Sequence, residues 1–120
     1  MSPGVIVGLV VVLVLVLGSR AVFAVKAGAV LSTRPEIESA RRVVSNVWRR
    51  HGFTATVTSG YDGSHQANSL HYEGLAEDYR TSDVPSNILP TMVAEVRAQL
   101  GSNYDVILES THLHVEYDPA

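Results

Sequence analysis

The 120-residue sequence contains no cysteine, so no disulfide can brace the fold. It also has no long stripe of basic residues, because 9 lysines and arginines stand against 12 acidic residues and the formal net charge is −3. Nucleic-acid binding therefore has little support. The short chain allows one small domain at most, near the size where a single core is marginal. A metal ion bound only by the folded state would add directly to its stability.

The chain opens on an apolar segment. Residues 5–17 are all valine, leucine or isoleucine apart from Gly8, and no charge occurs before Arg20. The run is shorter than the ~20 residues of a membrane span, but it has the length of a signal-peptide core. A buried strand or helix of the core is the less favoured interpretation, because so uniform a stretch would nearly fill the interior of a small domain.

The end of this segment leaves its fate open. Ala24 and Ala29 are plausible small-residue cleavage sites, which favours a signal peptide. Basic residues follow the apolar run rather than precede it, so an uncleaved version would tend to keep its C-terminal side in the cytoplasm. We expect residues 1–30 to be a signal peptide or membrane anchor, and the protein to be exported or membrane-anchored, outside the cytoplasm. Residues 31–120 then form the domain proper.

The pattern of this domain predicts an α+β fold. Thr33 to Glu36 has the form of a capping box ahead of a helix that Gly52 ends. Between the expected strands lies a long loop, 59–69, of a kind that is often functional in compact domains. The expected elements are helices over 35–50 and 85–100 and strands over 53–58, 75–80, 104–109 and 112–117. This order favours a small antiparallel sheet with helices packed on one face.

Two polar clusters carry the chemistry. The first, 71–78, contains His71 and Asp78, and the second, 109–114, contains Glu109, His112 and His114. A catalytic zinc takes three nitrogen or oxygen ligands and leaves one position for water, and two histidines with one aspartate fit that rule. A lone His-x-His strand is more often a solvated face. Here most of the histidines fall in the two clusters, so we expect one zinc ion per chain.

The remaining groups of the clusters suit a hydrolytic reaction. His112 and His114 are two apart on a strand, so their side chains share one face. With His71, Asp78 and His114 as ligands, Glu109 would act as general base toward a water on the metal. His112 would be free to hydrogen-bond a developing oxyanion. Glu109 could instead serve only as a partner to one of the ligands.

These residues also carry a family resemblance. Residues 69–78 resemble the Ser-x-His-x-x-Gly-x-Ala-x-Asp motif of the zinc D-alanyl-D-alanine carboxypeptidases and dipeptidases, and 109–114 resemble their second motif, Glu-x-x-His-x-His. The amino-acid sequence of residues 69–83 resembles the hedgehog signalling domain, a relative with the same zinc fold, even more closely. The resemblance spans about 57–117. It implies His71, Asp78 and His114 as zinc ligands, Glu109 as base and His112 as stabiliser of the transition state.

One departure affects the expected substrate. The peptidases usually carry Ser-Gly-Tyr-Arg ahead of the first motif, and that arginine clamps a substrate carboxylate. Here Asp62 follows Ser59-Gly60-Tyr61. An acid there would repel a C-terminal carboxylate, which favours an endopeptidase over a strict carboxypeptidase. Asp62 also resembles an acidic position of the hedgehog calcium site, but the other acids of that site are not evident, so no calcium is predicted. His65 is expected to be a polar loop residue.

Two hypotheses follow. The first is a zinc metallopeptidase that acts on peptidoglycan peptides, as a monomer that meets the membrane only through an uncleaved N-terminal segment. The alternative is a catalytically inactive hedgehog-like zinc module that binds a protein or peptide partner. Glu109 and His112 favour the enzyme, whereas Asp62 favours the binding module.

Overall fold

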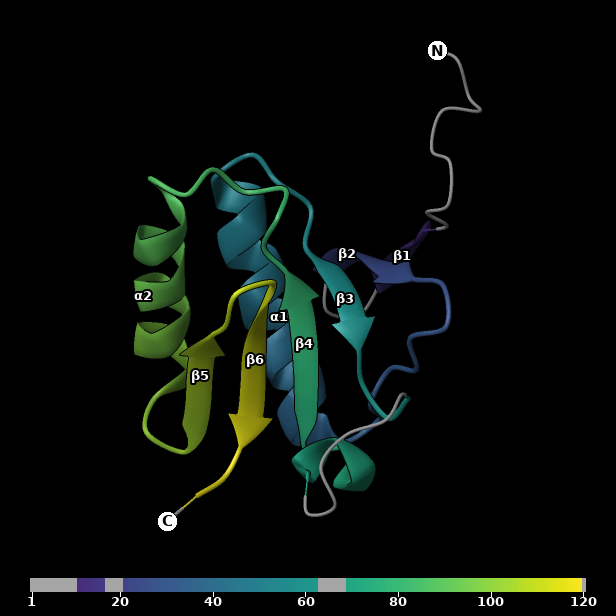
Figure 1. Cartoon of the computed structure of the whole chain (residues 1–120). Helices are drawn as coiled ribbons and strands as arrows, with labels where there is room; N and C mark the ends of the chain where they lie inside the picture. The colour runs from purple at the N-terminus through teal and green to yellow at the C-terminus, as the bar shows by residue number, and fades with distance from the viewer. Residues whose placement is uncertain (1–10, 17–20, 63–68, 120) are drawn as a thin grey trace.

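A mixed sheet backed by two helices forms the body of the protein (Figure 1). The computed structural model describes residues 11–16, 21–62 and 69–119. Along the chain its elements are β1 (Val11–Val16), β2 (Ala21–Lys26), α1 (Pro35–Arg50), β3 (Thr56–Ser59), the short 3₁₀ helix η2 (Leu70–Glu73), β4 (Ala76–Arg80), α2 (Leu89–Leu100), β5 (Tyr104–Leu108) and β6 (His112–Tyr117). The strand order across the sheet is β1-β2-β3-β4-β6-β5. The predicted α+β class is confirmed.

The sheet departs from the expected antiparallel pattern at one pairing. From β3 to β5 every neighbouring pair is antiparallel, as predicted. Strand β2, however, runs parallel to β3, with Ala24 facing Thr56 and Val25 facing Val57. The chain between these strands passes through α1, and parallel neighbours need such a crossover. The sequence analysis missed this pair because it assigned β2 to the segment before the domain.

The strand β2 belongs to the core. Phe23 is 1% exposed and packs in the cluster that α1 and α2 share with the sheet. The backbone amide of Ala24 donates to the carbonyl of Ala55 at 2.8 Å. Ala21–Lys26, which falls within the segment expected to be a signal peptide or membrane anchor, is therefore a strand of the sheet in this structure. Cleavage or membrane anchoring of residues 1–30 stays a prediction. None of the described helices is long and apolar enough to cross a membrane.

The two helices begin slightly differently from expectation. The residue at the N-cap of α1 is Arg34 and not Thr33, and no side chain caps the helix. Instead, the Ser32 hydroxyl accepts from the amide of Arg34 at 3.1 Å. Helix α2 begins at Leu89 rather than 85. Pro90 lies in its first turn and lacks the N–H that would extend the helix backwards, because proline has no backbone donor.

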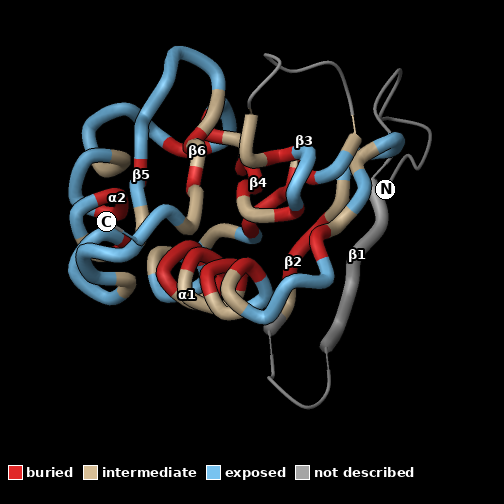
Figure 2. The backbone as a smooth tube through the Cα atoms, turned by 90° about the horizontal axis from the view of Figure 1, so that it is seen from below, coloured by how far each residue is buried: buried red, intermediate tan, exposed pale blue. Residues whose placement is uncertain are grey.

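The core lies between the helices and one face of the sheet, where buried residues gather in Figure 2. In β6 the side chains alternate, so that Leu113 and Val115 are buried at 0% exposure while His112 and His114 are only partly covered. Alternate residues of a strand point to opposite faces. The apolar face of β6 therefore meets the helices, and its histidines lie on the other face of the sheet.

Candidate metal centre

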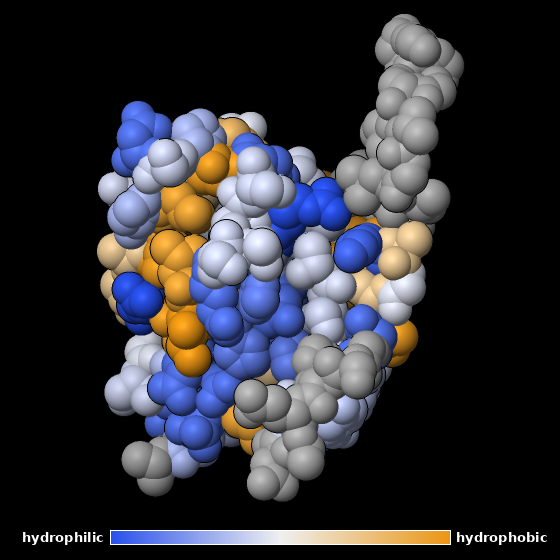
Figure 3. Space-filling model, viewed as in Figure 1, coloured by the Kyte–Doolittle hydropathy of each residue, from blue (hydrophilic) through white to orange (hydrophobic). Residues whose placement is uncertain are grey.

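The candidate site lies on the uncovered face of β4 and β6, where hydrophilic surface gathers in the middle of Figure 3. Asp78 on β4 pairs with His114 on β6, so their side chains leave the same face of the sheet side by side. Arg80 pairs with His112 in the next row of that face. The register of one strand pair thus brings together residues that lie more than 30 positions apart.

The third histidine comes from the short helix before β4. The Ser69 hydroxyl accepts from the amide of His71 at 3.2 Å and caps η2. Gly74 ends this turn with a φ of 72°, a left-handed conformation in which a Cβ would also meet the Tyr61 hydroxyl at 2.5 Å. The turn places His71, which is 2% exposed, beside Asp78 on β4. The serine and glycine of the motif therefore shape the backbone that presents this histidine.

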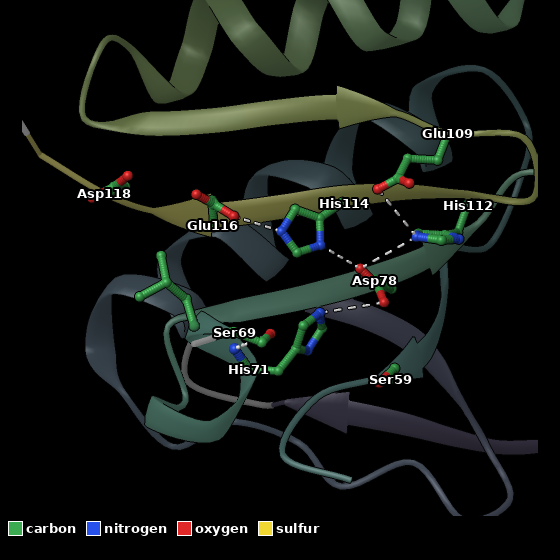
Figure 4. Close-up of a pocket in the computed structure, with 10 residues that line it drawn as sticks. Ser59, Ser69, His71, Asp78, Glu109, His112, His114, Glu116 and Asp118 are labelled. Carbon is green, nitrogen blue, oxygen red and sulfur yellow. Dashed lines mark hydrogen bonds and ion pairs between the residues drawn. The ribbon is translucent and has the colours of Figure 1, made fainter. Parts of the chain in front are cut away.

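The three predicted ligand residues converge (Figure 4). One donor atom from each of His71, Asp78 and His114 lies within 4.8 Å of the others, so the three could hold a metal ion. Nε2 of His71 is 3.4 Å from Oδ2 of Asp78, and Nδ1 of His114 is 2.8 Å from Oδ1. Tetrahedral bonds of 2.0–2.2 Å set ligand atoms about 3.4 Å apart, so small shifts would complete the geometry.

The outer nitrogen of each histidine is already engaged. Nδ1 of His71 lies 2.8 Å from the carbonyl oxygen of Gly60. Because a carbonyl oxygen only accepts hydrogen bonds, Nδ1 carries a hydrogen, and Nε2 faces Asp78. Nε2 of His114 lies 2.7 Å from Oε1 of Glu116, with Nδ1 facing Asp78. Metal-binding histidines are typically oriented in this way. The donor set therefore fits a metal ion.

Without a metal ion, a second proton on the His114 ring supplies the positive charge beside Asp78. Burial opposes the charged form of His114, yet hydrogen bonds to Asp78 and Glu116 raise its pKa to about 9. Burial would likewise raise the pKa of Asp78, but hydrogen bonds from His114 and His71 hold it well below its usual range. An imidazolium between two carboxylates is the expected state at neutral pH.

Glu109 and His112 lie at the rim of the same cleft. The amide of Glu109 donates to the carbonyl of His112 at 2.9 Å, which closes the turn between β5 and β6. Nε2 of His112 lies 3.7 Å from a carboxylate oxygen of Glu109 and 3.7 Å from Oδ1 of Asp78. The Glu109 side chain is 49% exposed and that of His112 28%. Both can therefore reach a molecule that enters the cleft.

The cleft has a volume of about 770 Å³ and an acidic lining. Its described walls include no lysine or arginine, but they include the carboxylates of Asp78, Glu109, Glu116 and Asp118. The sequence analysis missed Glu116, although its signal was present, because it continues the alternation of His112 and His114 along β6.

Asp62 has a structural role that the sequence did not predict. Its Oδ1 accepts from the backbone amides of Val30 and Gly60, each at 2.7 Å. Burial would raise the pKa of this carboxyl group, but the backbone hydrogen bonds lower it below its ordinary value. The carboxylate holds together the loop whose Gly60 carbonyl orients His71. His65, which was expected to be a polar loop residue, lies outside the described residues.

Most of the chain also matches a known protein family. Residues 30–116, well over half of the chain, match the model of the hedgehog amino-terminal signalling domain. The chain belongs to the hedgehog signalling-domain family. The expected resemblance to hedgehog is thereby confirmed, and the match covers all five predicted site residues. It begins at Val30, so the hedgehog match leaves out β1 and β2.

Proposed function

We propose that this hedgehog-family protein is a zinc-dependent peptidase that cuts peptides of the bacterial cell wall. The supporting observation is that one open cleft holds Glu109 and His112 beside the three convergent ligand side chains. A site that only bound a structural metal would need neither an exposed carboxylate nor a further imidazole at its rim, because structural zinc sites are closed by four protein ligands.

Zinc suits the donor set better than the harder divalent ions do. Two imidazoles and one carboxylate are typical ligands of catalytic zinc, whereas calcium and magnesium prefer oxygen alone. When bound by His71, Asp78 and His114, zinc would supply an acidified water and polarise the scissile carbonyl. Three protein ligands leave room for that water on the side of the cleft.

The two rim residues have distinct roles in this proposal. Glu109 takes a proton from the attacking water and passes it to the leaving amine, a role worth roughly 10²–10⁴ in rate. Its exposed carboxylate at the mouth of the cleft can contact both groups. His112 donates from Nε2 to the oxygen that becomes negative. Nδ1 of His112 lies 3.0 Å from the Thr111 hydroxyl, which helps to orient the ring.

The proposed substrate and location rest on the motif resemblance. The two clusters at 69–78 and 109–114 have the form found in zinc peptidases of peptidoglycan, and they lie beside an open cleft. A substrate of this kind lies outside the cytoplasm, which agrees with the proposed export or anchoring of the chain. The Asp62 carboxylate stays charged while it accepts from backbone amides, so the expected repulsion of a C-terminal carboxylate, which favours an endopeptidase, stays a prediction.

A second candidate is a zinc-stabilised module that binds a protein or peptide without cutting it. This candidate agrees with the family match, since the matched model describes a signalling domain. The two candidates differ in one measurable respect, because only the peptidase needs the carboxylate of Glu109.

The test uses the full chain on purified peptidoglycan, with one equivalent of zinc and again with a chelator, and measures new amine and carboxyl ends. We expect product with zinc alone and a loss of at least about 100-fold in Glu109→Gln at unchanged zinc content. Glu38→Gln, an exposed glutamate on α1, is the matched control and should keep full activity. No product from the zinc-loaded wild type would reject the peptidase in favour of the binding module.

A further inference from the structure

A second pocket adjoins the metal cleft on the same face of the sheet. It has a volume of about 420 Å³ and is lined by Lys26, Thr58, Arg80, Ser82, Ser110, Thr111 and His112. His112 lines both cavities, so the two form neighbouring parts of one surface. The two parts differ in charge, because this pocket contains two cationic side chains and no carboxylate among its described walls.

Strand register explains why these side chains share one pocket. Arg80 lies directly opposite His112 in the pairing of β4 with β6. On β2, Lys26 follows the Val25–Val57 pair and so lies beside Thr58 on β3. Arg80 is also two residues beyond Asp78 along β4, which places it on the same face at a distance of about 7 Å between Cα atoms. Arg80 therefore lies one step along β4 from Asp78, and Lys26 approaches the same pocket from β2, two strands away.

The cationic side chains of this pocket have no ionic partner in the part of the chain that the structure describes. Among the described residues, neither Arg80 nor Lys26 forms an ion pair, whereas Arg34, Arg41 and Arg50 each do. Arg80 is half-buried at the end of β4, and a guanidinium in that position can bind a carboxylate through two parallel hydrogen bonds. The serine hydroxyls at 82 and 110 add neutral donors to the same cavity.

We propose that Arg80, supported by Lys26, binds a carboxylate of the substrate, on the His112 side of the scissile bond and within one or two residues of it. The proposal rests on the proposed peptidase function and adds the orientation in which the substrate binds. The opposite end of the cleft, with Glu116 and Asp118, would repel the same carboxylate. The substrate therefore binds in one orientation, with its carboxylate over β4 and β2.

The first experiment measures binding by the zinc-loaded Glu109→Gln full chain, so that no product forms. The probes are two N-acetylated dipeptides that end in D-alanine, one as the free acid and one as the carboxamide. A third probe has the carboxamide end and a side-chain carboxylate one residue earlier, which separates the two sources of the acid. We expect one acidic probe to bind 10- to 100-fold more tightly than the carboxamide, because a charge-assisted bidentate contact is lost in the latter.

The second experiment repeats the comparison in Arg80→Met, Arg80→Lys, Lys26→Met and the control Arg49→Met, which lies on α1 away from the cleft. Arg80→Met should abolish the preference for acid over amide, while Arg80→Lys keeps part of it and Arg49→Met keeps all of it. Thermal unfolding of each variant verifies the fold.

Three outcomes of the binding experiments would overturn the proposal. They are equal binding of acid and amide, binding of none of the probes, and an acid preference that persists in Arg80→Met because the metal alone holds the carboxylate. Hydrolysis of peptidoglycan that is unchanged in Arg80→Met would reject this subsite while leaving the peptidase function standing. Absence of hydrolysis together with intact acid-selective binding would reject the peptidase function and leave the carboxylate subsite standing.

Discussion

Nδ1 of His114 lies 2.8 Å from Oδ1 of Asp78, across the pairing of β4 with β6. On its other side the same ring contacts Glu116 at 2.7 Å through Nε2. To donate to both carboxylates the ring must carry two protons, which agrees with a pKa raised to about 9. A metal ion that binds Nδ1 must displace one of these protons, so the metal-binding state and the protonated state of the site compete.

Metal-free protein should therefore lose stability as the pH rises. His114 has a folded pKa of about 9, above its ordinary value of 6.5, so its contribution is fully present below pH 6.5 and is lost as the pH rises through 9. With saturating zinc the trend should reverse between pH 6 and 8, because fewer protons compete for the ligands. Melting temperatures from pH 6 to 10, with chelator and with zinc, measure both trends. The His114→Gln variant should lack the contribution of this residue, and a rising stability of metal-free wild type over pH 7–9 would contradict the assignment.

The Glu116 carboxylate should control metal affinity without binding the metal. Glu116→Gln removes the charge that orients the ring of His114, and loss of such a partner typically weakens metal binding 10- to 100-fold. Zinc affinity, measured by competition with a chelating dye, provides the readout. Asp118→Asn, the neighbouring acid of the cleft, is the control and should change affinity far less. Equal effects of the two substitutions would indicate a general charge effect instead.

Behind the site, Glu77 and Arg41 form a buried ion pair. Glu77 is 0% exposed and Arg41 6%, and Nε of Arg41 donates to Glu77 at 2.9 Å. Glu77→Leu would leave the guanidinium without its counter-charge, and the free energy of unfolding should fall by about 3–5 kcal/mol. Urea denaturation measures it.

The double variant Arg41→Met with Glu77→Leu tests the cause. It should recover much of the lost stability, because an apolar pair of similar size needs no counter-charge. The exposed pair of Arg50 and Glu95 provides the contrast, since Arg50→Met should have no measurable effect. Recovery by the double variant is the decisive outcome, and its absence would show that other contacts of Glu77 dominate.

Phe23→Ala tests whether β2 is part of the folded domain. The ring is 1% exposed and lies against the guanidinium of Arg41 at 5.4 Å. Its loss should lower the free energy of unfolding by about 3–5 kcal/mol. Val30→Ala, at a half-exposed side chain, is the control and should have little effect. An unchanged stability of Phe23→Ala would mean that the domain in solution folds without β2.

Much of the fold, and the convergence of the three predicted ligand residues, could be obtained from the sequence. The helix at 35–50 matches α1 in both bounds, and the strand at 112–117 matches β6, because local periodicity alone determines them. The convergence of His71, Asp78 and His114 followed from residue types that suit one metal. Each of these inferences needed only local pattern or donor chemistry.

Other features depend on contacts that local pattern does not encode. The parallel pairing of β2 with β3 depends on where α1 delivers the chain, and the apolar run before β2 suggested a targeting segment instead. The burial of Glu77 could not be read from a strand that ends in Glu-Asp-Tyr-Arg, because its partner Arg41 lies 36 residues earlier. The hydrogen bonds from the backbone amides of Val30 and Gly60 to the Asp62 carboxylate likewise depend on the folded loop and could not be read from the sequence.

The adjacency of Glu77 and Asp78 on β4 has a consequence for how the strand aligns. A slip of one residue would exchange their faces, sending the shorter acid toward α1 and the longer one into the cleft. Arg41 holds a carboxylate of glutamate length, together with the Ser32 amide and the Tyr79 hydroxyl. We expect the misaligned sheet to be less stable, because Asp78 could not replace Glu77 in the buried contacts with Arg41. The buried ion pair thus helps to fix the register that directs Asp78 into the cleft.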